Sequence, residues 1–176
     1  SYSVTGVQTC ALPILTPEGN LWVSTYRGLV WKKSARFERP DGRLLNGPLT
    51  AQAVAFGPGK VYFATRIGVV AGDWPAGKDG LILTLLPGPL DKRERLAKAV
   101  AVGPDGEVWW SCGRGLCRFA GKRVEQFGQA EGVQEDDYYS LAVDRQGKVW
   151  ARSRDALLGM APDRKSTRLN SSHRIR

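Results

Sequence analysis

The strongest constraint on the fold of this chain is a turn followed by an aromatic residue, a pattern that occurs four times. The turn glycines are spaced 40, 47 and 41 residues apart, and an aromatic residue stands three positions after each: Gly19, Gly59, Gly106 and Gly147, with Trp22, Tyr62, Trp109 and Trp150. Repeats of about 40 to 50 residues are typical of β-propeller blades. We therefore predict an all-β fragment of a β-propeller, an open arc of about three to four blades, each a four-stranded antiparallel sheet.

Within each copy, short apolar runs alternate with turns, as expected for β-strands. The innermost strand of a blade is crowded, and three small apolar runs suit it: 53–56, 99–102 and 140–143. Candidate fourth strands lie at 81–85 and 123–127. Residues 73–98 are rich in glycine, proline and charge, which indicates a loop insertion. A β-sandwich has turns about every 8 to 12 residues, so the long shared period favours the propeller over it.

Both ends of the chain carry the signature of a sequencing adapter. Residues 4–14 (VTGVQTCALPI) and 163–173 (DRKSTRLNSSH) can be encoded by two DNA strings that are reverse complements of each other. The two ends of a folded domain have no reason to be related in this way, so such segments are excluded from fold reasoning. We expect 1–14 and 163–176 to be translated adapter without functional contacts, and 15–162 to be a partial β-propeller whose first and last blades each lack a strand.

Excluding these ends changes what the charge implies. Residues 163–176 hold five basic side chains against one acidic one, so the formal net charge of +9 falls to about +5. A basic tail would suggest nucleic acid or membrane partners. Without it, we expect no nucleic-acid contact by 15–162, and membrane attachment only through regions outside this sequence. The single histidine, His173, and one of three cysteines, Cys10, also lie in the excluded ends.

The copies resemble the two-component regulator propeller repeat, which reads approximately D-x-x-G-x-L-W-x-G-T-x-x-G-L. The run 144–150 (DRQGKVW) follows this pattern, as does 106–109 (GEVW) with Gly115 and Leu116 after it. The resemblance covers nearly all of 15–160. Some positions depart from it: Ser24, Ala64, Ser111, Ala151 and Ala156 replace the usual glycine, and Tyr62 replaces tryptophan.

The resemblance implies a role and a compartment. Many such repeats form periplasmic sensor regions that a transmembrane helix links to a histidine kinase, a diguanylate cyclase or a DNA-binding output. We therefore expect a ligand-sensing or interaction module of a bacterial two-component-type protein, partnered by its remaining blades and output domain. The alternative is a fragment of a propeller enzyme such as a virginiamycin-type lyase, although those enzymes rely on histidine. A third reading is a structural propeller that docks partners. The fold does not decide between these.

Each copy carries an arginine in its second turn: Arg27, Arg66, Arg114 and Arg154. In a propeller these turns share a face with the loops between blades, so the four side chains would form an arc. The planar guanidinium group suits carboxylates and sulfates. We predict an anionic small molecule or saccharide as the ligand of this arc. The competing interpretation, that arginine is simply a common solvated turn residue, is the one the sequence favours.

Cysteines flank the second turn of the third copy. Cys112 and Cys117 form a disulfide if the compartment is oxidising and the geometry permits, and two buried free thiols are the alternative that the sequence favours. Two cysteines without histidine cannot complete a zinc site, so we expect no metal. Four acidic residues cluster in one loop between blades and suit either a cation site or a solvated loop: Glu131, Glu135, Asp136 and Asp137. No cofactor or catalytic motif occurs in 15–162, so the segment itself is not expected to be catalytic.

The repeated aromatic residues have two readings. They suit a sugar-stacking platform, but their constant position in each copy favours packing between blades. Trp110, next to Trp109, points to the opposite face of its strand, so the sequence leaves its role open.

Overall fold

The computed structural model describes residues 12–15, 21–25, 28–33, 36–38, 50–75, 82–89, 95–162 and 169–175. These residues form four separate four-stranded sheets, and in each sheet the strands follow one another in sequence order and pair antiparallel. One short 3-10 helix, η2 (Gln129–Glu131), lies between the third and fourth sheets. Among these residues, no helix is long and apolar enough to cross a membrane.

The strand boundaries follow the four copies of the repeat. The first sheet contains β1 (Leu12–Leu15), β2 (Leu21–Thr25), β3 (Gly28–Lys33) and β4 (Arg36–Glu38). The second contains β5 (Ala53–Gly57), β6 (Lys60–Thr65), β7 (Gly68–Asp73) and β8 (Leu83–Leu85). The third contains β9 (Val100–Val102), β10 (Val108–Cys112), β11 (Gly115–Ala120) and β12 (Arg123–Phe127). The fourth contains β13 (Ser140–Val143), β14 (Val149–Arg152), β15 (Leu157–Pro162) and β16 (Leu169–Ile175).

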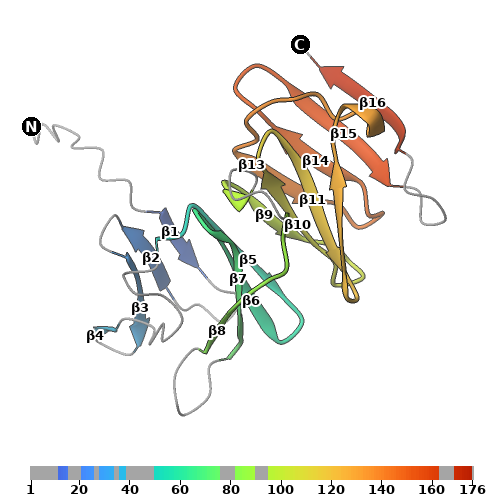
Figure 1. Ribbon diagram of the computed structural model, residues 1–176. Coiled ribbons are helices and arrows are strands. Elements are labelled where there is room, and N and C mark those ends of the chain that lie inside the picture. Colours follow the sequence, from blue (N-terminus) through green and yellow to red (C-terminus); the bar gives the residue numbers. More distant parts are fainter. Residues whose placement is uncertain are drawn as a thin grey trace, which may run out of the picture.

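The innermost strands lie side by side, β5 next to β9 and β9 next to β13. Figure 1 shows the four sheets in a row, with the first and last sheets at opposite ends. Sheets that pack face to face around adjacent first strands are the blades of a β-propeller. The predicted fold class is therefore confirmed, and the three predicted innermost strands correspond to β5, β9 and β13.

The end segments supply one strand to each terminal blade. β1 pairs with β2 in the first blade, and β16 pairs with β15 in the last. Both added strands overlap the segments predicted to be translated adapter. A free strand edge presents unpaired N–H and C=O groups, and any extended segment can pair with them, whatever the origin of its sequence.

The glycine turns have the backbone conformation that the repeat requires. Gly106 has φ +79° and Gly147 has φ +83°, in the left-handed region where a side chain is strained. A Cβ atom at either glycine would meet no heavy atom within 4 Å. Backbone conformation, rather than lack of space, therefore explains glycine at these turns.

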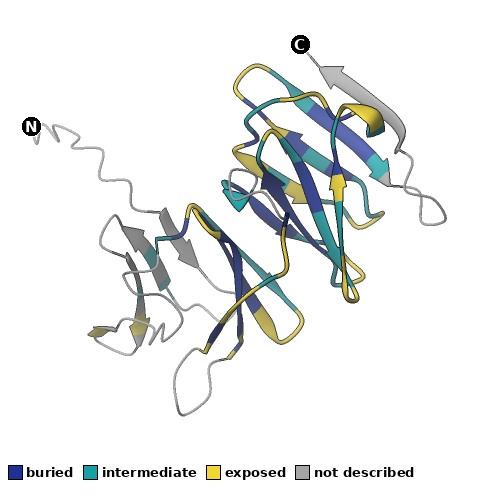
Figure 2. Ribbon diagram, viewed as in Figure 1, coloured by how far each residue is buried: buried dark blue, intermediate teal, exposed yellow. Residues whose placement is uncertain are grey.

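The core is divided into layers between neighbouring blades (Figure 2). The layer between the second and third blades contains Tyr62, Ala64, Val69, Ala71, Ala97, Val100, Val108, Trp110, Cys112 and Cys117. The layer between the third and fourth contains Trp109, Leu116, Phe127, Val133, Tyr138, Val149, Ala151, Leu158 and Met160. Two of the repeated aromatic residues, Tyr62 and Trp109, lie in these layers and face the following blade. Both are therefore packing residues. Trp110 is equally buried and faces the preceding blade.

Candidate functional site

The second turns and the loops between blades meet at one end of the blades, which we call the linker end. Backbone hydrogen bonds connect them. Ala97 N donates to Thr65 O at 2.9 Å, Asp136 N to Arg114 O at 3.0 Å, and Tyr139 N to Arg152 O at 2.9 Å. The glycine turns lie at the opposite end of the strands, which we call the turn end. The predicted arginines therefore share a face with the linkers.

The four arginines occupy two different positions within their turns. Arg27 lies outside the described residues, and Arg66, Arg114 and Arg154 are all exposed. Counted from the residue that closes the turn (Gly28, Gly68, Gly115 or Ala156), Arg27 and Arg114 come one position earlier, whereas Arg66 and Arg154 come two positions earlier. Successive turn residues project in different directions, so one continuous arc does not follow from the shared turn. Whether these residues bind a ligand stays a prediction.

Two of the second turns are closed by a hydroxyl group. Thr65 Oγ1 donates to Gly68 O at 2.7 Å and accepts from Ile67 N at 3.2 Å. At the equivalent position of the fourth blade, Ser153 Oγ accepts from Ala156 N at 3.2 Å. These contacts fix the turn without help from neighbouring elements.

The third blade has a disulfide where the second and fourth blades have the hydroxyl. Cys112 occupies the position of Thr65 and Ser153, and its Sγ atom is bonded to Cys117 Sγ at 2.05 Å. Cys112 pairs with Gly115 across the hairpin, so the bridge runs diagonally to the residue two positions further along β11. Both cysteines are buried in the layer against the second blade. The free-thiol alternative therefore does not describe this structure.

A cavity of about 530 Å³ opens beside this turn at the linker end. Its walls come from the turn itself, the end of β12 and η2. Leu116 and Phe127 contribute buried apolar surface, and Arg114, Gln126, Gln129, Glu131 and Glu135 contribute polar groups. Gln126 and Gln129 were not predicted as site residues, because the repeat pattern marks no polar position in β12 or η2.

Arg114 reaches from this turn to the following linker. Its Nη1 atom lies 3.6 Å from Glu135 Oε2, and its Nη2 donates to Glu135 O at 3.4 Å. The two side chains are 68% and 55% exposed, respectively. Both distances are at the long end for such contacts, so the guanidinium group is only loosely held.

The acidic residues of the linker do not form a shared site. Glu131 Oε2 accepts from Gly128 N at 2.8 Å, Asp136 Oδ1 accepts from Asp137 N at 2.7 Å, and Glu135 faces Arg114. Asp137 lies 2.8 Å from Lys98 Nζ, and this hydrogen bond lowers the pKa of the Asp137 carboxyl group, with burial opposing it. Within the described part of the chain, no group of three potential metal ligands occurs.

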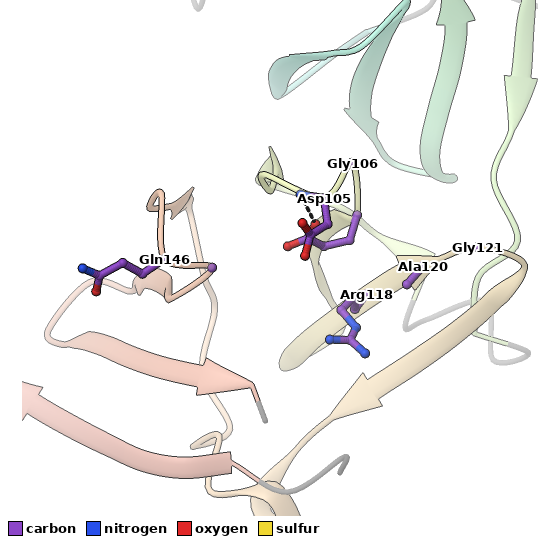
Figure 3. Close-up of a pocket in the computed structure, with 8 residues that line it drawn as sticks. Asp105, Gly106, Arg118, Ala120, Gly121 and Gln146 are labelled. Atoms are coloured by element: carbon purple, nitrogen blue, oxygen red, sulfur yellow. Dashed lines mark hydrogen bonds between the residues drawn. The ribbon is translucent and has the colours of Figure 1, made fainter. Parts of the chain in front are cut away.

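A second hollow, of about 330 Å³, lies at the turn end between the third and fourth blades. It is lined by Asp105, Gly106, Glu107, Arg118, Ala120, Gly121, Gln146 and Gly147. Figure 3 shows Arg118 extending into the space below the Asp105 turn, while Gln146 points away from it. Arg118 Nη2 lies 2.6 Å from Glu125 Oε2, and the guanidinium group stacks 5.5 Å from the Trp109 ring centroid. Because Arg118 is already held on two sides, this hollow is the weaker candidate for a site.

Several solved structures are similar to this chain. The extracellular domain of a hybrid two-component system from B. thetaiotaomicron matches with a TM-score of 0.72 and 18% identity, over 94% of this chain and 23% of that one. A catalytically inactive virginiamycin B lyase from Staphylococcus aureus, solved with quinupristin, matches with a TM-score of 0.67 and 12% identity, over 97% of this chain and 58% of that one. A gluconolactonase from Xanthomonas campestris matches with a TM-score of 0.60 and 13% identity, over 80% and 52%.

These comparisons establish the fold. At such identities the shared architecture does not carry over a function. The chain spans less than a quarter of the two-component domain and about half of the two enzymes. No protein-family model matches the sequence, and no curated protein matches it.

Proposed function

We propose that this chain is a ligand-sensing or interaction part of a bacterial two-component-type signalling protein. The output domain, a histidine kinase, a diguanylate cyclase or a DNA-binding domain, then lies outside this sequence. Support comes from the likeness to extracellular domains of two hybrid two-component systems, with TM-scores of 0.72 and 0.66. The cavity beside Arg114 supports the ligand-sensing part of the proposal, because small-molecule sites are concave with a few convergent polar groups.

The proposal includes a place and a kind of ligand. Because those two similar structures are extracellular domains, we place this part in the periplasm. The ligand is an anionic small molecule or saccharide bound at the linker end, where Arg66, Arg114 and Arg154 are exposed. The partners are further blades and the output domain of the same protein.

The alternative is a propeller enzyme. The likeness to a lyase and a gluconolactonase, with TM-scores of 0.67 and 0.60, supports this reading. The two proposals differ in what happens to the small molecule. A sensor binds its ligand and releases it unchanged, whereas a lyase or lactonase converts it.

One experiment separates them. The purified chain is incubated with a panel of sugar acids, neutral sugars, sugar lactones and quinupristin, and its thermal unfolding midpoint is measured alongside mass spectrometry of the added compound. A raised midpoint with the compound recovered intact supports the sensor proposal. Enzyme-dependent conversion of a lactone or of quinupristin overturns it in favour of the enzyme. No shift with any compound counts against ligand sensing by this part of the protein.

A further inference from the structure

The second turn of the third blade differs from its described counterparts. Its position before the turn holds a bonded cysteine in place of the hydroxyl found in Thr65 and Ser153. Among the described second turns, it is the one for which the structure records an arginine contact with the next linker. The cavity lies directly beside it. These features together single out one turn of the repeat for a role that packing alone does not require.

The charged side chains that line the cavity are one arginine and two glutamates, and the two glutamates are held differently. Arg114 is the cation among its lining residues. Of the two carboxylates, Glu131 is used within the wall, where it accepts the Gly128 N–H. That leaves Glu135 as the carboxylate facing the guanidinium group, at the long distance of 3.6 Å. Exposed pairs of this kind contribute little, so another carboxylate can replace Glu135 at low cost.

The remaining lining indicates what else the ligand carries. Gln129 is exposed at the rim and provides an amide group that both donates and accepts. A volume of about 530 Å³ lies within the usual range for small-molecule sites. A ligand with one carboxylate and several hydroxyl groups would suit this lining.

We propose that this cavity binds a small hydroxylated carboxylic acid, with Arg114 as its carboxylate partner and Glu135 as an internal competitor. This inference rests on the proposed function and assigns its site. Binding exchanges one carboxylate for another on the guanidinium group and releases Glu135 from the turn. Because Glu135 belongs to the linker between the third and fourth blades, the exchange gives ligand binding a direct effect on the connection between blades.

The turn should survive substitution of Arg114. Asp136 N donates to the backbone oxygen of residue 114 at 3.0 Å, which does not depend on the side chain. The disulfide holds the same hairpin independently. A loss of binding in Arg114→Gln therefore reports on the guanidinium group rather than on unfolding.

The test uses calorimetric titration of the whole chain with glucuronate, and with glucose as a neutral compound of similar size. Arg114→Gln should weaken glucuronate binding by up to about fivefold, because the exposed guanidinium group loses one charge pair. Glu135→Gln should strengthen it up to about fivefold, because the competitor is removed. Arg145→Gln removes an equal charge at the turn end and should change nothing. Glucose should bind much more weakly than glucuronate to the unchanged chain.

The outcomes are separable from those of the functional proposal. Glucuronate binding that is not weakened in Arg114→Gln, or that weakens in Glu135→Gln, overturns the assignment of the site but leaves a sensor with its site elsewhere. Failure of glucuronate to bind overturns the ligand class assigned here, while the wider panel still decides the sensor proposal. Conversion of the bound compound overturns the sensor proposal itself, even if Arg114 is needed for binding.

Discussion

At the scale of single residues, two equivalent tryptophans show how the repeat tolerates change at its turns. Trp150 Nε1 donates to Asp144 Oδ2 at 3.3 Å, and Asp144 Oδ1 also accepts from Gln146 N and Lys148 N. The third blade has Gly103 in place of Asp144. There Glu107 turns back, so that a Cβ atom on Gly103 would collide with its carboxylate, and Glu107 Oε2 accepts from Asp105 N at 3.1 Å. The buried Trp109 Nε1 is left without a partner in the structure.

We predict that the Asp144 arrangement can be restored in the third blade. Gly103→Asp alone should stabilise the protein little, because the flexible Glu107 carboxylate must move aside and then lies close to a like charge. Glu107→Ala alone should destabilise it through the lost turn contact. Together, the two changes should be favourably coupled by about 1 kcal/mol or more, since Asp at 103 supplies both the turn acceptor and a partner for Trp109 Nε1. Urea unfolding of the wild type, the two single variants and the double variant measures this coupling. Strictly additive effects of the two changes on the free energy of unfolding would contradict it.

A second residue-scale prediction concerns pH. The Lys98 hydrogen bond lowers the pKa of Asp137 below its usual 3.8, with Tyr139 and Arg114 adding smaller contributions. The folded state therefore prefers the ionised carboxyl, and its contribution is present above the unfolded pKa and lost as pH falls through the folded pKa. The stability difference between the wild type and Asp137→Asn should shrink as pH falls from 6 to 3. In a Lys98→Met background, where this hydrogen bond is absent, Asp137→Asn should show little such change.

At the scale of elements, the disulfide and the hydroxyl contacts act as alternative ways to close a turn. Reduction of Cys112–Cys117 should lower the free energy of unfolding by about 2 kcal/mol, since the closed loop is short. Cys112→Thr with Cys117→Ala should recover part of this loss, because threonine at this position closes the turn in the second blade. Cys112→Val with Cys117→Ala is the matched control without the hydroxyl. Equal stability of the two double variants in chemical denaturation would argue against the hydroxyl's role.

The repeat allowed most of these elements to be predicted. A fixed spacing of turn glycine and aromatic residue determines where β6, β10 and β14 begin, and small apolar runs mark β5, β9 and β13. Of the predicted fourth strands, 123–127 corresponds to β12, whereas β8 covers Leu83–Leu85 of 81–85, whose first residue lies outside the described residues. The cavity was not predicted, because the repeat pattern marks no polar position in β12 or η2. The disulfide stayed open, because cross-strand distances depend on the pairing register, which the sequence does not give.

At the scale of the whole molecule, stability comes from faces that neighbouring blades cover. Equivalent alanine and aromatic pairs lie on the same face of three successive blades: Ala55 with Tyr62, Ala101 with Trp109, and Ala142 with Trp150. Ala101 and Trp109 are buried beneath the fourth blade. Ala142 is exposed and Trp150 only half-buried, with Lys148 Nζ 4.1 Å from the Trp150 ring centroid. The outer face of the fourth blade therefore carries the same alanine and aromatic pair as the buried faces, but there the pair is not buried.

This face should make the chain associate with itself at high concentration. Exposed apolar surface of an interface-like face and free strand edges both favour association. Ala142→Lys places a charge on the innermost strand of this face and should reduce the association seen by analytical ultracentrifugation, because burying that charge is costly. Gln146→Lys adds the same charge at the exposed turn of the same blade and should have little effect. If both variants associate like the wild type, or if the wild type stays monomeric throughout, the face does not behave as an open interface.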